Sequence, residues 1–337
     1  MSEIICGDSL AVLRELPSES VYVCVTSSPY YGLRDYGVDG QIGNEENPSV
    51  YVERLVEIFR EVRRVLKKDG TLWLNIADSY AGSGKGVWSK HVSERPKSKQ
   101  VYHVLSDNSD ATMPNRFEGI KPKDMIGIPW LLAFALRNDG WYLRSDVIWQ
   151  KPNAMPEPVK DRPTKSYEHI FLLSKSPQYY YDAEAIMEPL QKSTVERNKR
   201  AVSTNGKYAE GLPGQNMQGI FKPRSHTDAP PMRNKRDVWT VSTNSYKVDG
   251  HFAVYPERLI EPCILAGCPV GGIVLDPFFG SGTTGAVAKR LGREYIGIDL
   301  NSDYCQIAAE RIGKVNDAKS VVIKAQNEYF SKRGVIT

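Results

Sequence analysis

The segment of residues 272–300, GIVLDPFFGSGTTGAVAKRLGREYIGIDL, constrains the fold more than any other part of the chain. An apolar run ends at Asp276, a turn with Gly280 and Gly282 follows, and a helical pattern leads to a second apolar run that ends at Asp299. This is the layout of Rossmann-like nucleotide-binding units, in which glycines let the backbone approach a ligand and the final acid binds ribose hydroxyls. The segment therefore predicts an α/β sheet with a nucleotide-like ligand at its carboxyl edge.

The residues in and before this turn limit which ligands it can bind. The turn lacks the third glycine of dinucleotide-binding turns and carries no lysine, which excludes a Walker-type phosphate cradle. Asp276 lies directly before the turn, where a carboxylate repels pyrophosphate and attracts a cationic or amino-acid ligand. S-adenosylmethionine fits, because it joins adenosine to a sulfonium and a zwitterionic methionine without phosphate. A nicotinamide dinucleotide stays as the alternative.

Apolar runs alternate with amphipathic stretches along most of the chain. Strand-like runs lie at 4–6, 21–26, 71–76, 146–150, 169–174, 272–276 and 295–299, and helical spacing marks 50–67, 123–138, 256–266, 283–291 and 302–313. This alternation predicts an α/β fold with a mostly parallel seven-stranded sheet and helices on both faces.

Two polar stretches, 81–122 and 187–250, interrupt this alternation. Residues 187–250 contain 11 Lys and Arg against 6 Asp and Glu, and residues 81–124 contain 8 against 5, although the whole chain carries only +4. Solvated basic loops are the simplest interpretation. Long irregular segments inside a compact domain are, however, more often functional or folded on a partner, and positive charge of this kind suits a phosphate backbone.

Other features argue against a membrane or metal protein. No apolar run approaches the roughly 18 residues of a membrane span, and the first residues resemble no secretory signal, so we expect a cytoplasmic protein without a membrane partner. Five cysteines without a CxxC pair and five scattered histidines favour reduced thiols and no metal site.

A second motif, TSSPYYGLRDYG at 26–37, follows the apolar run VYVCV. Together with DPFFGSGTT it gives the chain a resemblance to the DNA amino-methyltransferases, whose S-adenosylmethionine loop reads DPFxGSGT. IICGDSLAVLREL near the N-terminus and HFAVYPERLIEPCI at 251–264 resemble two further cofactor segments of that family. The resemblance implies cofactor contacts from Asp8, Phe252, Pro256, Asp276, Pro277, Phe278, Gly280, Ser281, Gly282, Thr283 and Asp299.

The family's catalytic tetrapeptide is Asp, Asn or Ser followed by two prolines and an aromatic residue, and it aligns with Ser27, Ser28, Pro29 and Tyr30. An exocyclic amine is a poor nucleophile, because its lone pair is delocalised into the ring. The resemblance implies that the Ser27 hydroxyl and the Ser28 carbonyl accept the two amine hydrogens. Pro29 would shape the loop, and Tyr30 would stack on a flipped-out base. Ser28 departs from the family's proline, but this position contributes its backbone carbonyl.

The catalytic motif precedes the cofactor loop, which is the circularly permuted order of the family's β group. We expect a catalytic domain in two parts, 1–186 and 251–316, a target-recognition region at 187–250 and a tail at 317–337. Residues 145–174 resemble the family's middle motifs beside the target base. The candidate DNA contacts are Arg34, Lys151, Arg162, Arg224, Arg233, Lys235 and Arg236.

These features predict a bacterial or phage enzyme that methylates the N4 amine of a cytosine at a specific site in double-stranded DNA. Cytosine is favoured because serine opens the tetrapeptide, and N6-adenine methylation is the main alternative. A glutamine methyltransferase would carry Asn-Pro-Pro-Tyr after its cofactor loop, and a non-catalytic nucleic-acid-binding protein would not need both loops intact. An RNA methyltransferase is a further alternative. A cognate restriction endonuclease is a candidate partner.

Overall fold

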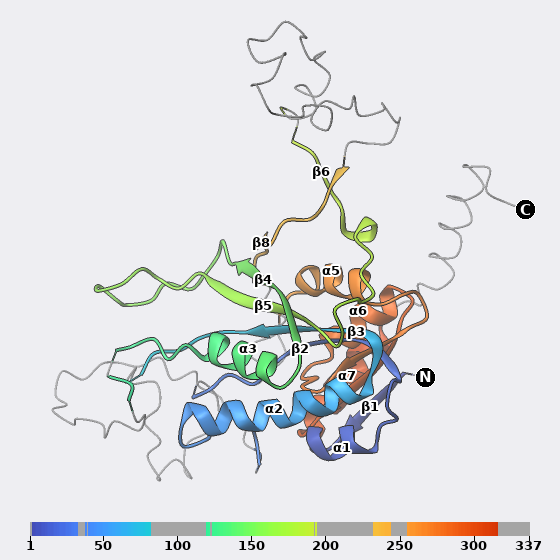
Figure 1. Ribbon diagram of the computed structural model, residues 1–337, viewed down its shortest axis with the longest axis horizontal. Coiled ribbons are helices and arrows are strands. Elements are labelled where there is room, and N and C mark those ends of the chain that lie inside the picture. The colour runs from blue at the N-terminus through green and yellow to red at the C-terminus, as the bar shows by residue number, and fades with distance from the viewer. Residues whose placement is uncertain are drawn as a thin grey trace, which may run out of the picture. The chain divides into compact units, whose positions relative to one another are not determined.

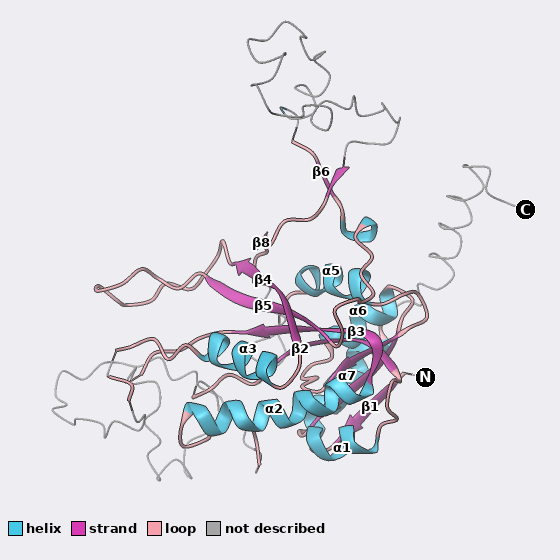
Figure 2. Cartoon of the chain, in the orientation of Figure 1, coloured by secondary structure: helices cyan, strands magenta, loops and turns pink. Residues whose placement is uncertain are grey.

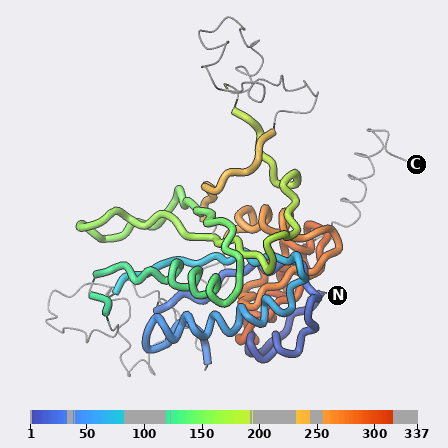
Figure 3. The backbone as a smooth tube through the Cα atoms, in the orientation of Figure 1, coloured from blue at the N-terminus to red at the C-terminus, as the bar shows by residue number. Residues whose placement is uncertain are grey.

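The computed structural model describes residues 2–32, 38, 40–81, 119–121, 123–191, 193, 232–243 and 255–315. Its main feature is an eight-stranded sheet of order β1-β10-β9-β2-β3-β5-β4-β8 (Figure 1). The strands are β1 (Glu3–Cys6), β2 (Val21–Ser27), β3 (Leu66–Ile76), β4 (Tyr142–Gln150), β5 (Tyr167–Ser174), β8 (Val238–Thr240), β9 (Ile273–Asp276) and β10 (Glu294–Asp299). The blue N-terminal strand β1 lies beside the orange C-terminal strand β10 (Figure 3). The predicted α/β class is confirmed.

Most neighbouring strands of this sheet are parallel. The pairs β1–β10, β10–β9, β9–β2, β2–β3 and β4–β8 are parallel, whereas β5 is antiparallel to both β3 and β4. The centre of β2, from Val23 to Thr26, is buried throughout, as expected for a strand covered on both faces. The short strand β8 makes the sheet eight-stranded instead of the predicted seven. Its three residues lie in a polar stretch where only Trp239 is buried, so they form no apolar run.

Helices cover both faces of the sheet (Figures 1 and 2). One layer contains α1 (Ser9–Glu15), α2 (Pro48–Val65) and α3 (Ile128–Asn138), and the other contains α5 (Glu257–Gly267), α6 (Thr283–Arg290) and α7 (Ser302–Gly313). Helix α2 begins cleanly because the Asn47 side chain accepts a hydrogen bond from the Val50 amide and Pro48 occupies the first turn. All predicted helices are present.

Helix α3 begins five residues later than the predicted start at residue 123. Met125 forms a β-bridge with Tyr80, so the chain is extended there. Gly127 then adopts a φ of 82°, and the amides of Gly127 and Ile128 both donate to the Asp78 carboxylate at 3.0 Å. This carboxylate caps the helix from a distant loop, which no local pattern announces.

Residues Ala183–Lys235 form a second compact unit. Its described part contains a 3-10 turn, η2 (Glu184–Ile186), and a two-stranded ribbon of β6 (Glu188–Pro189) and β7 (Met232–Arg233). An ion pair of 3.0 Å between Arg233 and Glu188 closes the ribbon. The unit overlaps the region expected to recognise the target, and that role stays a prediction.

For membrane spans and metal sites, the structure gives information on the described residues only. None of their helices combines the length and apolar character that a membrane crossing requires. Nor do they contain a cluster of three His, Cys, Asp or Glu side chains that could hold a metal ion.

Candidate active site

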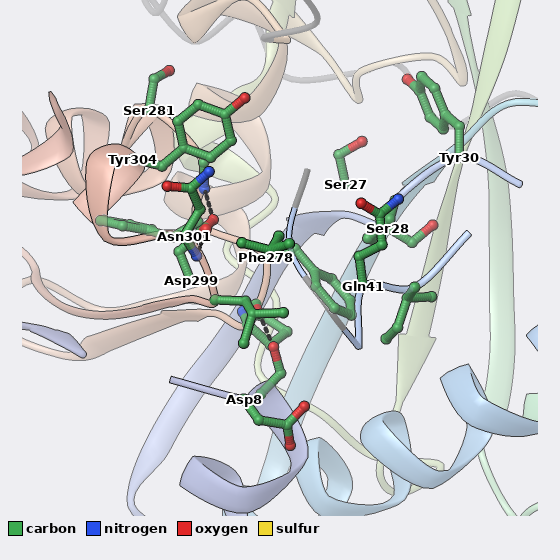
Figure 4. A pocket seen from close by; sticks show the side chains of 18 of the residues that line it. Asp8, Ser27, Ser28, Tyr30, Gln41, Phe278, Ser281, Asp299, Asn301 and Tyr304 are labelled. Atoms are coloured by element: carbon green, nitrogen blue, oxygen red, sulfur yellow. Dashed lines mark hydrogen bonds between the residues drawn. The ribbon is translucent and has the colours of Figure 1, made fainter. Parts of the chain in front are cut away.

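A pocket lies at the carboxyl edge of β1, β2, β9 and β10, where open α/β sheets bind ligands (Figure 4). Its walls come from the glycine-rich turn, the ends of β1 and β10, and the loop after β2. The predicted residues that line it are Asp8, Ser27, Ser28, Pro29, Tyr30, Pro277, Phe278, Gly280, Ser281, Thr283 and Asp299. The fold thus brings both sequence motifs to one cavity.

Asp276 lies beneath this pocket instead of lining it. Its carboxylate is buried and accepts hydrogen bonds at Oδ1 from the Thr26 hydroxyl (2.6 Å) and the Phe278 amide (3.1 Å). At Oδ2 it accepts from the hydroxyls of Thr284 (2.5 Å) and Tyr255 (3.1 Å). Burial raises the pKa of Asp276, while these hydrogen bonds favour its ionised form. The carboxylate therefore ties β2, the turn and the segment before α5 together from within.

Asp299 holds the glycine-rich turn and also faces the pocket. The Gly280 amide donates to Asp299 Oδ2 at 2.7 Å, and the Asn301 amide donates to Oδ1 at 2.9 Å. Gly280 has a φ of 52°, in the left-handed region that favours glycine. Burial raises the pKa of the Asp299 carboxyl. The turn therefore presents its backbone to a ligand, and Asp299 at the end of β10 adds an acidic side chain.

Asp8 marks the start of α1 at the pocket wall. Its side chain accepts a hydrogen bond from the Ala11 amide at 2.9 Å and so caps the helix. The next residue, Ser9, donates its hydroxyl to the Pro277 carbonyl at 2.6 Å. This bond joins the N-terminal strand and helix to the glycine-rich turn.

Three other predicted cofactor residues do not appear in the lining. Gly282 has a φ of 76°, and a Cβ there would lie 2.7 Å from the Ala308 Cβ, so this glycine permits close packing of α6 on α7. Pro256 is the residue before α5. Phe252 lies outside the described residues.

The Ser27–Tyr30 loop is held from two sides. Ser27 is the last residue of β2 and pairs with Asn75 of β3. The Pro29 carbonyl accepts a hydrogen bond of 2.6 Å from the Tyr51 hydroxyl of α2. Gly43, at a φ of 106°, approaches so closely that a Cβ would lie 2.7 Å from the Tyr30 carbonyl oxygen. This packing fixes the backbone of the loop before any substrate arrives.

Glu168 connects this loop to two further strands. The residue is only 6% exposed. Oε2 accepts hydrogen bonds from the Tyr30 hydroxyl (2.9 Å) and the Asn75 side-chain amide (3.0 Å), and Oε1 accepts one from the Lys151 ammonium. Lys151 also lies 4.3 Å from the centre of the Trp149 ring. Lys151, which was predicted to contact DNA, therefore pairs with the carboxylate that holds Tyr30 of the pocket.

Arg162 and Arg236, which belong to the first unit, do not line the pocket. Arg162 pairs with Glu157 at 2.6 Å and stacks 3.9 Å above the Tyr80 ring. Arg233 forms the ion pair with Glu188 in the second unit. Lys235 ends that unit, Arg236 begins the following segment of the first unit, and Arg34 and Arg224 lie outside the described residues.

Several residues of the site are absent from the sequence prediction. Gln41 projects into the pocket between the two motifs, and Asn301 and Tyr304 extend the wall beyond Asp299 (Figure 4). The last two follow a predicted strand end and could have been found from it. Gln41 and Glu168 reach the site only through tertiary structure.

A Rossmann-like sheet whose pocket joins a glycine-rich turn to a Ser-Ser-Pro-Tyr loop fits a group-transfer enzyme. A family model described as DNA methylase, for N6 and N4 methyltransferases, matches residues 21–310. The chain therefore belongs to the DNA methylase family. It is a DNA methyltransferase, as the sequence predicted, and its substrate is DNA.

Individual relatives agree with this assignment. The type II methyltransferase M.Cfr9I of Citrobacter freundii is 47% identical over 91% of this chain and 86% of its own length. The structure of the cytosine-N4-specific PvuII DNA methyltransferase matches with a TM-score of 0.60, over 96% of this chain and 91% of that one, at 18% identity. The structure of the M1.HpyAVI–SAM complex matches with a TM-score of 0.50, over 93% and 99%, at 16% identity. The two structural matches support the fold.

Proposed function

We propose that this enzyme transfers a methyl group from S-adenosylmethionine to the N4 amine of a cytosine in duplex DNA, as the modification enzyme of a type II restriction pair. The observation that carries the proposal is the single pocket shared by the Ser27–Tyr30 loop and the turn around Gly280. Ser27, at the first position of the tetrapeptide, favours cytosine. The type II name of its relative and the N4 specificity of the PvuII enzyme support the same assignment.

The pocket suits a cofactor that carries no phosphate. Asp8 and Asp299 line it, and among the residues described no lysine or arginine does. A pyrophosphate would meet two carboxylates there, which disfavours the dinucleotide alternative. In the proposed complex Asp299 accepts hydrogen bonds from the ribose hydroxyls. Asp8 lies near the adenine, and the Phe278 ring offers the adenine an apolar face. M1.HpyAVI, which shares the fold, has been solved as a SAM complex.

The remaining turn residues complete this proposed cofactor site. The backbone of Pro277, Gly280 and Ser281 and the Thr283 side chain border the cofactor, whereas Asp276 and Gly282 position the turn from below. Phe252 and Pro256 are proposed for the methionine end on resemblance alone.

The reaction needs orientation more than strong acids or bases. S-adenosylmethionine supplies an electrophilic methyl group on a sulfonium. The Ser27 hydroxyl and the Ser28 carbonyl accept the two amine hydrogens and aim the nitrogen lone pair at that methyl group. A serine hydroxyl is too weakly basic to remove a proton first. The excess proton would therefore pass from the methylated nitrogen to water after transfer, when the cofactor sulfur would leave as a neutral thioether. Pro29 shapes the loop, and Tyr30 stacks on the flipped cytosine.

The basic residues provide the proposed salt-dependent grip on DNA. Contacts to phosphates position a duplex, and contacts to base edges specify its sequence. Residues 187–250 would supply the base contacts. The candidate residues are Arg34, Lys151, Arg162, Arg224, Arg233, Lys235 and Arg236.

Product analysis tests this proposal. The full chain is incubated with plasmid DNA and S-adenosylmethionine labelled in the methyl group, and the DNA is digested to nucleosides. We expect the label in N4-methylcytosine. Label in N6-methyladenine would contradict the cytosine assignment, and no transfer to any duplex DNA would contradict the proposed reaction.

A further inference from the structure

Glu168 is a buried carboxylate that three separate elements share. It lies near the start of β5 and accepts hydrogen bonds from Tyr30 in the loop after β2, from Asn75 in β3 and from Lys151 after β4. Burying a carboxylate is costly unless charge and hydrogen bonds compensate. Lys151 supplies the opposite charge, and its side chain is 19% exposed. Such an arrangement fixes the orientation of the carboxylate.

Among these donors, the Tyr30 hydroxyl belongs to the side chain that is predicted to stack on the target base. A tyrosine ring on a loop turns about two side-chain torsions, so its face is directed only when something holds its far end. The hydrogen bond of 2.9 Å to Glu168 Oε2 does this, since the carboxylate itself is held by Lys151. The ring is therefore fixed before a base arrives.

Asn75 extends the same connection to the other catalytic side chain. It pairs with Ser27 across β2 and β3, and its amide donates to both Glu168 Oε2 (3.0 Å) and the His169 carbonyl (3.1 Å). Glu168 Oε2 thus binds both the Tyr30 hydroxyl and Asn75, the residue that pairs with Ser27. These contacts set the position of the Tyr30 ring relative to Ser27. A base held by both residues would need this relation kept to within a fraction of an ångström.

We infer that Glu168 is the positioning residue for the target base: it holds the Tyr30 ring, with Lys151 as its charge partner, at the distance from Ser27 that methyl transfer to the amine requires. The inference rests on the proposed function, in which Tyr30 stacks on the base and Ser27 holds the amine. Glu168 acts through Tyr30 and need not touch the substrate.

Four variants test this inference on the full chain: Tyr30→Phe, Glu168→Ala, Glu168→Gln and the double variant Tyr30→Phe/Glu168→Gln. Tyr30→Phe keeps the stacking ring and removes only its hydroxyl. Because hydrogen bonds to charged groups are strong, we expect it to lower kcat/KM for plasmid DNA by about 10- to 100-fold. Glu168→Ala should lose at least as much. Glu168→Gln keeps an oxygen acceptor and should recover part of the loss.

The double variant separates positioning from a general structural role. If the hydroxyl and the carboxylate act as one unit, Tyr30→Phe/Glu168→Gln should be no slower than the slower single variant, within about threefold. Cofactor affinity should stay within about twofold in all variants, since Glu168 holds the Ser27–Tyr30 loop and not the glycine-rich turn. Tyr31→Phe is the matched control, because it removes a 3.3 Å hydrogen bond to the Glu45 carbonyl from the adjacent tyrosine. Its kcat/KM should change less than twofold.

Each outcome decides the matter. A fully active Tyr30→Phe enzyme, or losses that multiply in the double variant, would overturn the role of Glu168, even if Glu168→Ala proves too unstable to assay. The proposed function fails separately, when the wild-type chain transfers no methyl group to DNA. An adenine product would change the base and leave the test of Glu168 in force, because a flipped adenine would stack on the same ring.

Discussion

The pocket has a donor wall on the glycine-rich turn, proposed to hold the methyl donor, and an acceptor wall on the Ser27–Tyr30 loop, proposed to hold the methyl acceptor. The polar atoms that lie behind these two walls are satisfied to different degrees. On the donor side, the Asp276 carboxylate accepts four hydrogen bonds from within the protein. On the acceptor side, the buried Ser28 hydroxyl and the Asn75 side-chain oxygen have no hydrogen-bond partner among the described residues. The hydrogen bonds around Asp276 are thus complete before any ligand binds. Beside the Ser27–Tyr30 loop, by contrast, the described residues leave two buried polar atoms unpaired.

The largest effect should come from breaking the donor wall. In Asp276→Ala, three hydroxyls and one amide lose their acceptor in a buried place, while the cost of burying the carboxylate disappears. We expect the free energy of unfolding to fall by about 3 kcal/mol, measured by urea denaturation. Cofactor affinity should fall with it, because the turn loses its support.

Asp276→Asn is the control for this change. Its side chain keeps one acceptor oxygen at the same place, so the loss should be only about 1 kcal/mol. An Asp276→Ala protein as stable as the wild type would show that the four hydrogen bonds do not hold the donor wall together.

Adjacent residues of β2 sharpen the comparison, since successive side chains of a strand point to opposite sides. Thr26 donates to Asp276 and belongs to the donor wall, whereas Ser27 lines the pocket. Ser27→Ala should lower kcat at least tenfold, about 1.4 kcal/mol in barrier height, with cofactor affinity nearly unchanged. Labelled methyl transfer and equilibrium cofactor binding measure the two quantities.

Thr26→Val provides the matched variant for Ser27→Ala. It should lower stability and cofactor affinity, and it should affect kcat less than Ser27→Ala does. If the two variants change the same quantity, the division between the walls is not real, and an active Ser27→Ala enzyme would remove the proposed role of Ser27.

The sequence predicted the parts of the site that depend on local chain geometry. Gly280 was found from the glycine-rich turn that follows an apolar run, and Ser27 from the alignment of Ser27–Tyr30 with the family's catalytic tetrapeptide after the apolar run at 21–26. The surroundings of Asp276 could not be predicted in this way. Its position before the turn was clear, but Tyr255 and Thr26 reach it only in the folded protein, and they turn its carboxylate inward.

The same limit applies to the acceptor side. The resemblance placed residues 145–174 beside the target base but gave Glu168 no role, because its partners Tyr30 and Asn75 are 138 and 93 residues away in sequence. The eighth strand was missed for a related reason, since β8 is held by its pairing with β4 and not by an apolar run of its own.

The smallest effect is expected where the sequence departs from the family's tetrapeptide. Ser28 supplies a carbonyl to the proposed reaction, and its amide donates to the Asn75 carbonyl at 3.3 Å, a bond that proline could not form. Its buried hydroxyl has no partner among the residues that the structure describes, so Ser28→Ala removes an unsatisfied polar atom and leaves the backbone unchanged. We expect the free energy of unfolding to rise by up to about 1 kcal/mol and kcat to change less than threefold. A tenfold loss of kcat in Ser28→Ala would instead assign the hydroxyl to the substrate, and the acceptor wall would then use this side chain as well as its carbonyl.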